Sequence, residues 1–184
     1  MASLSLPPSL PPISSLPTAS TETITSALDT LFEPSPDIHA LALPYIQQGS
    51  NPNPFPSYAS LIQHIGAQLL QLCSSSDKAA LHRILGSHPR LGAQKVDSAQ
   101  SRAEQAQLNS DDADTRAKLQ ALNDEYEARF PGLRYVVFVN GRSRPAVMEN
   151  MRYRINRGDF AAEEREGVQA MVDIALDRAK KLGG

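Results

Sequence analysis

The sequence has no tryptophan, one cysteine, and no apolar run near the roughly 18 residues that a membrane span needs. The single thiol, Cys73, excludes an intrachain disulfide, and its place in an apolar stretch predicts a buried group in a reducing compartment. Positive and negative charges nearly balance: the formal net charge is −2 and the isoelectric point is near 6.1. We therefore expect neither nucleic acid nor a membrane surface as a partner.

The motifs that usually hold a metal or a cofactor are missing as well. There is no H-E-x-x-H pair and no cysteine cluster, so no metal site is predicted. A glycine-rich phosphate loop and a G-x-S-x-G elbow are also absent. The functions that remain are a reaction that needs no cofactor, or ligand binding without catalysis. The first 20 residues carry no positive charge, which argues against a secretory signal or a transit peptide, and we expect a cytoplasmic protein.

What the sequence does contain fits a single helical domain. Its 184 residues, 41% of them hydrophobic, suit one core. Residues 1–20 are rich in proline and serine and are expected to be a disordered tail, with the domain over residues 21–184. The apolar spacing predicts an all-α multi-helix bundle. The expected helices are 21–32, 37–48 with a kink or break at Pro44, 58–72, 77–85, 98–108, 112–129, 143–156 and 159–182.

One segment, residues 133–139, is predicted to be extended. Its sequence, Leu-Arg-Tyr-Val-Val-Phe-Val, has the β-branched and aromatic bias of a strand, and the Asn-Gly pair that follows signals a turn. No partner strand is visible in the sequence. The backbone groups of this segment must therefore find hydrogen-bond partners in loops, water or a ligand.

The most informative motif surrounds His88. Gly86 is expected to end the preceding helix as a C′ residue, and Pro89 favours an extended conformation for His88. An imidazole displayed on a rigid turn suits general acid or base chemistry near neutral pH. The alternative is that His88 caps the helix C-terminus, where a positive charge is favourable.

Two further groups are candidates for the same site. Ser101 and Glu104 have the S-x-x-E spacing of a helix capping box, which is an alternative to a catalytic role. Arg178 falls inside the apolar arc of the last predicted helix. A guanidinium aimed at the interior must be paired, so Arg178 either forms an ion pair, for example with Glu104, or binds an anionic ligand.

The order and spacing of these motifs resemble those of the 2-oxo-4-hydroxy-4-carboxy-5-ureidoimidazoline (OHCU) decarboxylases of uric acid degradation, over about residues 22–182. The segments that carry the resemblance are Leu31-Phe32-Glu33-x-Ser35-Pro36, Ser87-His88-Pro89-Arg90-Leu91-Gly92, Ser101-x-x-Glu104-Gln105, Leu122-Asn123-x-x-Tyr126, Val139-Asn140-Gly141-Arg142-Ser143 and Ile174-Ala175-x-x-Arg178.

The resemblance implies an all-helical, cofactor-free and often dimeric enzyme that converts OHCU to (S)-allantoin and carbon dioxide. It implies that His88 is the catalytic histidine, that Glu104 is the carboxylate beside it, and that Arg178 holds the substrate. Pro89, Ser101 and Gln105 match positions that shape or contact the ligand. The extended segment is expected to line the pocket and to offer backbone groups to the substrate, through Val136, Val137, Phe138 and Val139.

Several expectations and departures accompany the resemblance. A carboxylate at Glu104 should favour the imidazolium form of His88, and Arg178 should keep Glu104 ionised. Many family members have Ala-Gly after the Glu-Gln pair, where this chain has Ala106-Gln107-Leu108. The chain ends in Leu182-Gly183-Gly184, which is not a peroxisomal signal.

Two other functions are alternatives to the decarboxylase. One is an inactive binding or regulatory domain of the same fold, and the other is a ureide hydrolase that uses His88 as a base on water.

Overall fold

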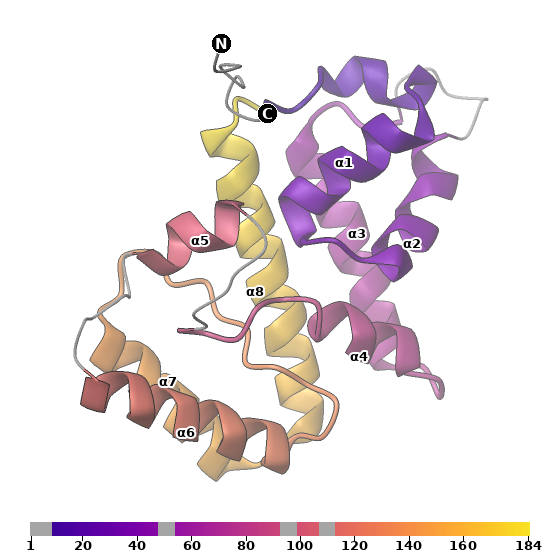
Figure 1. The fold of residues 1–184 in the computed structure, drawn as a ribbon. Helices are drawn as coiled ribbons and strands as arrows, with labels where there is room; N and C mark the ends of the chain where they lie inside the picture. Colours follow the sequence, from indigo (N-terminus) through magenta and orange to yellow (C-terminus); the bar gives the residue numbers. More distant parts are fainter. Residues whose placement is uncertain (1–8, 48–53, 93–98, 107–112) are drawn as a thin grey trace.

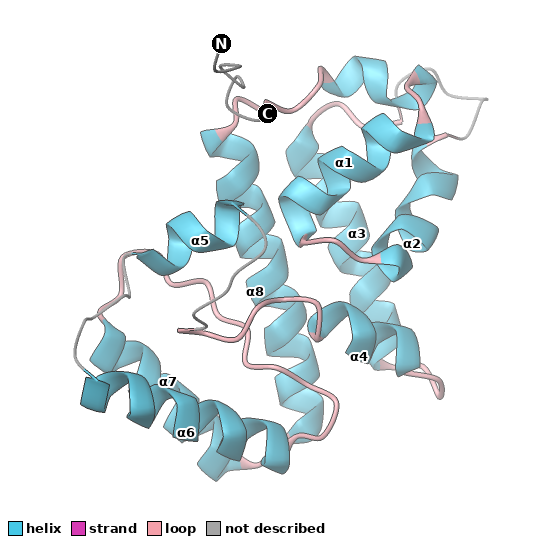
Figure 2. Ribbon diagram, in the orientation of Figure 1, coloured by secondary structure: helices cyan, strands magenta, loops and turns pink. Residues whose placement is uncertain are grey.

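The protein is built of helices joined by loops (Figures 1 and 2). The computed structural model describes residues 9–47, 54–92, 99–106 and 113–184, and within 99–106 it describes the side chains of residues 100–103. The described residues form no strand, which confirms the predicted all-α fold. The helices are η1 (Ile13–Thr18), α1 (Thr21–Phe32), α2 (Pro36–Ile46), α3 (Tyr58–Cys73), α4 (Ala79–Leu85), α5 (Ala99–Ala106), α6 (Ala113–Arg129), α7 (Arg144–Arg157) and α8 (Phe160–Lys181).

Several helix starts are fixed by short polar side chains. Ser20, Ser35, Ser57, Ser143 and Asp159 each accept a hydrogen bond from the backbone N–H three residues further on. Each cap satisfies one unpaired N–H of the first turn and contributes about 1 kcal/mol to stability. The helix starts predicted after Ser57, Ser143 and Asp159 are confirmed.

Helix α8 runs through the middle of the molecule, between the group α1–α4 and the group α5–α7 (Figure 1). It packs tightly against α3 at Gly66, where an added Cβ would lie 2.6 Å from Cγ2 of Val172. Met171 and Ile174 lie on its buried face. Because α8 is central, the predicted inward face of this helix also brings Arg178 into the core, where it is 2% exposed.

The helix at 36–46 does not break at its internal proline. Helix α2 continues through Pro44 to Ile46, so the expected break is not observed. Pro44 lies in the last turn, where it removes one hydrogen bond from a helix that is about to end. The free energy lost with this one hydrogen bond is small, so the helix completes its last turn.

The N-terminal residues 9–20 belong to the folded domain, in contrast to the tail predicted over 1–20. Leu16 of η1 is buried, and the hydroxyl of Tyr58 donates to the carbonyl of Pro11 at 2.7 Å. Prolines restrict the chain before it folds and so lower the entropy lost on ordering. This effect, with the burial of Leu16, explains why a proline-rich segment docks. Residues 1–8 lie outside the described part of the chain.

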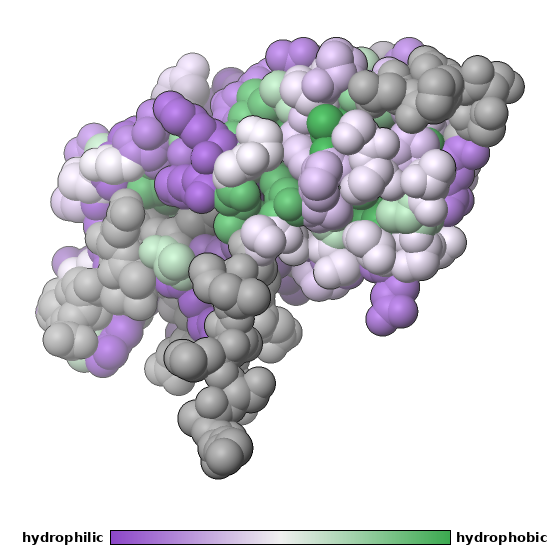
Figure 3. All heavy atoms as spheres, turned by 90° about the horizontal axis from the view of Figure 1, so that it is seen from above, coloured by the Kyte–Doolittle hydropathy of each residue, from purple (hydrophilic) through white to green (hydrophobic). Residues whose placement is uncertain are grey.

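The surface is mixed in character. Seen from above, hydrophilic and hydrophobic residues alternate, with small apolar groups surrounded by polar ones (Figure 3). Within the described residues, the exposed large hydrophobic side chains are Leu70 and Tyr153. No helix in this part of the chain is long and apolar enough to cross a membrane.

Candidate active site

The loop that carries His88 is held on both sides by side chains from distant segments. The guanidinium of Arg134 donates to the carbonyl of His88 at 3.0 Å, and the side-chain amide of Asn123 on α6 donates to the carbonyl of Leu91 at 3.0 Å. Gly86 ends α4 as predicted, but with φ of −75° and not in the left-handed conformation of a C′ glycine. The position of His88 is therefore fixed by contacts to α6 and to the segment after it.

His88 is a buried histidine with an unused nitrogen. Its side chain is 5% exposed, and Nε2 has no hydrogen-bond partner among the described residues. Burial lowers the pKa of His88 to about 4; the carboxylate of Glu33 raises it and Arg178 lowers it. The imidazole is therefore neutral at pH 7, because desolvation outweighs the negative charge of Glu33. The expected influence of Glu104 on His88 stays a prediction, since the Glu104 side chain lies outside the described residues.

His88 lines a small, partly open cavity of about 50 Å³, which has room for a few water molecules. The residues that line it come from the His88 loop, α5, α8 and the extended segment: His88, Pro89, Leu91, Ser101, Tyr135, Val136, Val137, Val139 and Ile174. A larger pocket of about 370 Å³ shares Val137, Val139 and Ile174 with it. Six of the predicted site residues thus meet at one cavity, whereas Phe138 lines the larger pocket.

Arg178 lies behind this cavity and is fully engaged with α1 and α5. One terminal nitrogen donates to Oε1 of Glu33 at 2.7 Å and to Oγ of Ser101 at 3.0 Å. The other lies near the carbonyls of Thr30 and Leu31, at 3.4 and 3.3 Å. The sequence predicts an inward, paired guanidinium, and the structure shows that Glu33 is a partner.

Glu33 is a site residue to which sequence reasoning gave no role. It is 3% exposed, and the hydroxyl of Ser101 donates to its Oε1 at 2.5 Å. Burial alone would raise the pKa of this carboxyl, but Arg178 and the hydrogen bonds outweigh burial and hold it below its usual value. One signal was available: an acidic side chain at a helix C-terminus opposes the helix dipole, so Glu33 at the end of α1 calls for a cation.

Ser101 is not a helix cap. Helix α5 begins at Ala99, which places Ser101 inside the first turn, and its hydroxyl donates to Glu33 on α1. The capping-box alternative for Ser101 and Glu104 is therefore wrong. The hydroxyl is directed to the interior by a partner that is distant in the sequence.

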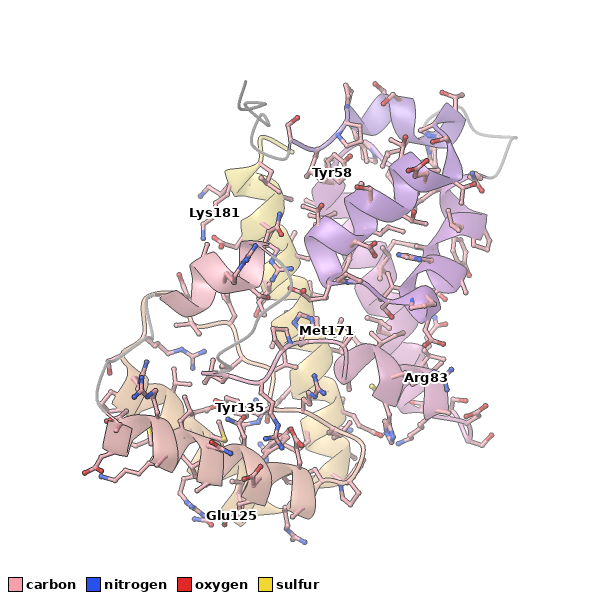
Figure 4. All side chains as sticks on the ribbon, in the orientation of Figure 1. Tyr58, Arg83, Glu125, Tyr135, Met171 and Lys181 are labelled. Carbon is pink, nitrogen blue, oxygen red and sulfur yellow. The ribbon has the colours of Figure 1, made fainter. Side chains whose placement is uncertain are left out.

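The extended segment 133–139 is irregular, and side chains satisfy its carbonyl groups. Arg154 on α7 donates to the carbonyl of Val136 at 3.1 Å, and Arg142 donates to the carbonyls of Phe138 and Val139. Tyr135 (Figure 4) is 4% exposed, and its hydroxyl donates to Oδ1 of Asn150 at 2.6 Å. Guanidinium groups thus take the place of a partner strand.

Arg154 is itself part of a buried ionic cluster. Its guanidinium lies 2.7 Å from Oε2 of Glu163, which also accepts from the hydroxyl of Tyr126 at 2.6 Å. Arg154 is 3% exposed, and its guanidinium lies 4.9 Å from the centre of the Tyr135 ring. This cluster holds the extended segment against α7 and α8.

A comparison with known protein families shows to which family the chain belongs. The family model of the OHCU decarboxylases matches residues 17–180. The chain belongs to the OHCU decarboxylase family. A comparison with curated proteins found no match.

Two of the residues that the OHCU decarboxylase resemblance singled out cannot be located by their side chains. Glu104 and Gln105 belong to α5, and their side chains lie outside the described residues. Their roles stay predictions. Within the described residues there is no group of three or more histidine, cysteine or acidic side chains placed to hold a metal ion.

Proposed function

We propose that this OHCU decarboxylase family member converts OHCU to (S)-allantoin and carbon dioxide without a cofactor. The observation that carries the proposal is His88, a neutral buried imidazole that lines the cavity and whose Nε2 has no hydrogen-bond partner in the part of the chain that the structure describes. An unpaired polar atom in a protein interior is costly and calls for an explanation. A substrate that supplies the missing hydrogen bond provides one.

The reaction itself needs little from the protein beyond orientation and proton transfer. When the bond to the carboxylate breaks, its electron pair enters the ring and is accepted by the C=N group, whose nitrogen takes up one proton from solvent water. The hydroxyl group then loses its proton and becomes a carbonyl, and the adjacent ring carbon gains one. The electron sink therefore lies within the substrate, where other decarboxylases use a cofactor.

A neutral imidazole fits the proton steps. His88 can accept the hydroxyl proton at Nε2 and deliver a proton to the neighbouring carbon from the same face of the ring. Delivery from one face gives a single stereoisomer, (S)-allantoin. A histidine that was already protonated could not take the first proton.

The remaining groups supply charge and position. Arg178 donates to Ser101 in the cavity wall and is proposed to hold an anionic or carbonyl oxygen of the substrate. Glu104 is proposed to orient the hydroxyl or ureido group, with Pro89 and Gln105 shaping the ligand's surroundings. The segment Val136–Val139 is proposed to offer backbone groups to the substrate.

The test follows product formation on freshly made substrate. OHCU is generated from urate with the two preceding enzymes, and (S)-allantoin is followed by circular dichroism with and without the protein. We expect acceleration over spontaneous decay and its loss in His88→Gln. His64→Gln is the matched control. Among the described residues Nε2 of His64 also has no hydrogen-bond partner, but its ring packs against Tyr45 and Phe55, away from the cavity.

Two outcomes would overturn the proposal in different ways. No acceleration by the wild-type protein would favour a binding or regulatory domain of the same fold. Full activity in both His88→Gln and Glu104→Gln would keep the reaction but reject the assigned roles. A possible homodimer is tested separately by sedimentation of the purified protein.

A further inference from the structure

Glu33 has an unusual backbone for a residue with a side chain. It follows α1 with φ of 71° and ψ of 154°, a region that is almost exclusive to glycine. Such a conformation is strained and persists only where surrounding contacts impose it. The backbone N–H of Glu33 donates to the carbonyl of Asp29, which closes the last turn of α1 and turns the carboxylate inward.

The carboxylate joins three helices at one point. Its Oε1 accepts from Ser101 on α5 at 2.5 Å and from Arg178 on α8 at 2.7 Å. The last turn of α1 adds two carbonyls near the same guanidinium, those of Thr30 and Leu31. The orientation of Arg178 is therefore set by α1, through Glu33 and the turn before it.

Glu33 does not line the cavity, but its partner does. The cavity wall includes Ser101 and also Ile174, which precedes Arg178 by one turn of α8. Glu33 thus lies one side chain behind the wall. It can act on a substrate only through Ser101, through Arg178, or through its negative charge on His88.

We propose that Glu33 is a positioning residue of this site, which holds the guanidinium of Arg178 and the hydroxyl of Ser101 in their substrate-binding orientation and places a negative charge near His88. This inference rests on the proposed function for its kinetic part. The electrostatic part concerns the resting protein and does not depend on turnover. A carboxylate is needed because it can accept from both donors and balance the arginine charge.

The first measurement is kinetic. Glu33→Gln keeps the shape and one acceptor oxygen but removes the charge, and Glu33→Asp keeps the charge but shortens the reach. We expect both variants to lose kcat/KM on the order of 100-fold per folded molecule, the size of effect that a displacement of about 1 Å can cause. Thermal unfolding and far-ultraviolet circular dichroism give the folded fraction of each variant.

Glu164→Gln is the matched control. Glu164 on α8 is also fully buried, and it accepts from Lys78 at 2.6 Å and from His82 at 2.8 Å, outside the cavity wall. A change there removes a buried carboxylate from the same fold. We expect a loss of stability similar to that of Glu33→Gln, with kcat/KM per folded molecule unchanged.

The second measurement needs no substrate. Nuclear magnetic resonance of the imidazole nitrogens follows the protonation of His88, which faces Glu33 of α1 and Arg178 of α8, with Arg134 on its carbonyl. Tyr135 shares the cavity, and burial raises its pKa to about 12, so its hydroxyl remains neutral. Glu33→Gln removes the negative charge and should move the titration of His88 to lower pH. Glu164→Gln should leave it in place.

The outcomes separate the two proposals. If Glu33→Gln changes only stability, and both the kinetics and the His88 titration match those of Glu164→Gln, the positioning role is refuted. If the wild-type protein does not accelerate OHCU decay, the proposed function fails, and the titration alone then decides the role of Glu33. A shift to lower pH supports that role, and an unchanged titration rejects it.

Discussion

Burial of His88 should make the stability of this protein fall as the pH is lowered from 6.5 toward 4. The pKa of this imidazole changes from 6.5 in the unfolded chain to about 4 in the folded protein, with desolvation as the main cause. Between these values the unfolded chain binds a proton that the folded protein does not. Stability then decreases as the pH decreases, because the unfolded state holds more protons.

The size of the effect follows from the same two values. Each pKa unit corresponds to about 1.4 kcal/mol, so the change from 6.5 to about 4 amounts to about 3 kcal/mol of unfolding free energy. Midway through this window, the slope should approach 1.4 kcal/mol per pH unit, the value for one proton. Above pH 7.5 the contribution should be constant, since both states are then neutral.

The assay compares the wild-type protein with His88→Asn by urea denaturation at several pH values. Far-ultraviolet circular dichroism is the suitable probe, because the protein is helical and has no tryptophan for fluorescence. His39, His64 and His82 are present in both proteins, so their titrations cancel in the difference. Equal pH dependence in the two proteins would refute the reasoning, since it would mean that the folded protein protonates His88 as readily as the unfolded chain.

Three further predictions address the packing, the extended segment and catalysis. Gly66→Ala inserts a methyl group 2.6 Å from Val172 and should lower the unfolding free energy, measured in urea, by about 1–3 kcal/mol. Adding Val172→Ala should restore part of the lost stability. If it restores none, this contact is not the cause of the loss. Arg154→Met removes one of the two guanidinium partners of the buried Glu163, leaves Arg157 as the other, and releases the carbonyl of Val136. It should cost about 3 kcal/mol, the lower end of the range for a broken buried ion pair, and speed hydrogen exchange in the segment between α6 and α7 more than in α3. Uniform acceleration would contradict a local role. The decrease of kcat/KM at acid pH should be centred near pH 4, because kcat/KM reports the free enzyme and burial lowers the pKa of His88 to about 4. A decrease centred near pH 6.5 would mean that the reactive base is exposed.

The parts of the fold that depend on near neighbours could be predicted from the sequence. The start of α3 follows from Ser57, whose side chain needs only the N–H of Ser60 three residues on. The inward position of Arg178 follows from its place on the apolar arc of α8, and it is 2% exposed. Both depend on periodicity and capping within one or two turns, which the sequence displays directly.

The parts that depend on distant contacts could not be predicted. Glu33 and Arg178 are 145 residues apart, and no local pattern joins them. The positive φ of Glu33 gives no signal in the sequence, where glycine would be expected at such a conformation. The lowered pKa of His88 could not be predicted for a related reason, because the extent of burial depends on how α5, α8 and the extended segment enclose the loop.

The two buried ion pairs near the cavity have an organisation that stability alone does not explain. Burying a guanidinium with a carboxylate costs so much solvation that an apolar pair of the same volume is often as stable. Each pair also holds one group of the cavity wall: Arg178 with Glu33 holds the hydroxyl of Ser101, and Arg154 with Glu163 holds the carbonyl of Val136. These charges fix the positions of polar groups of two residues that line the same cavity as His88. A site that supplies orientation and one proton carrier depends on such fixed positions, because misplacement by about 1 Å can cost a factor on the order of 100 in rate.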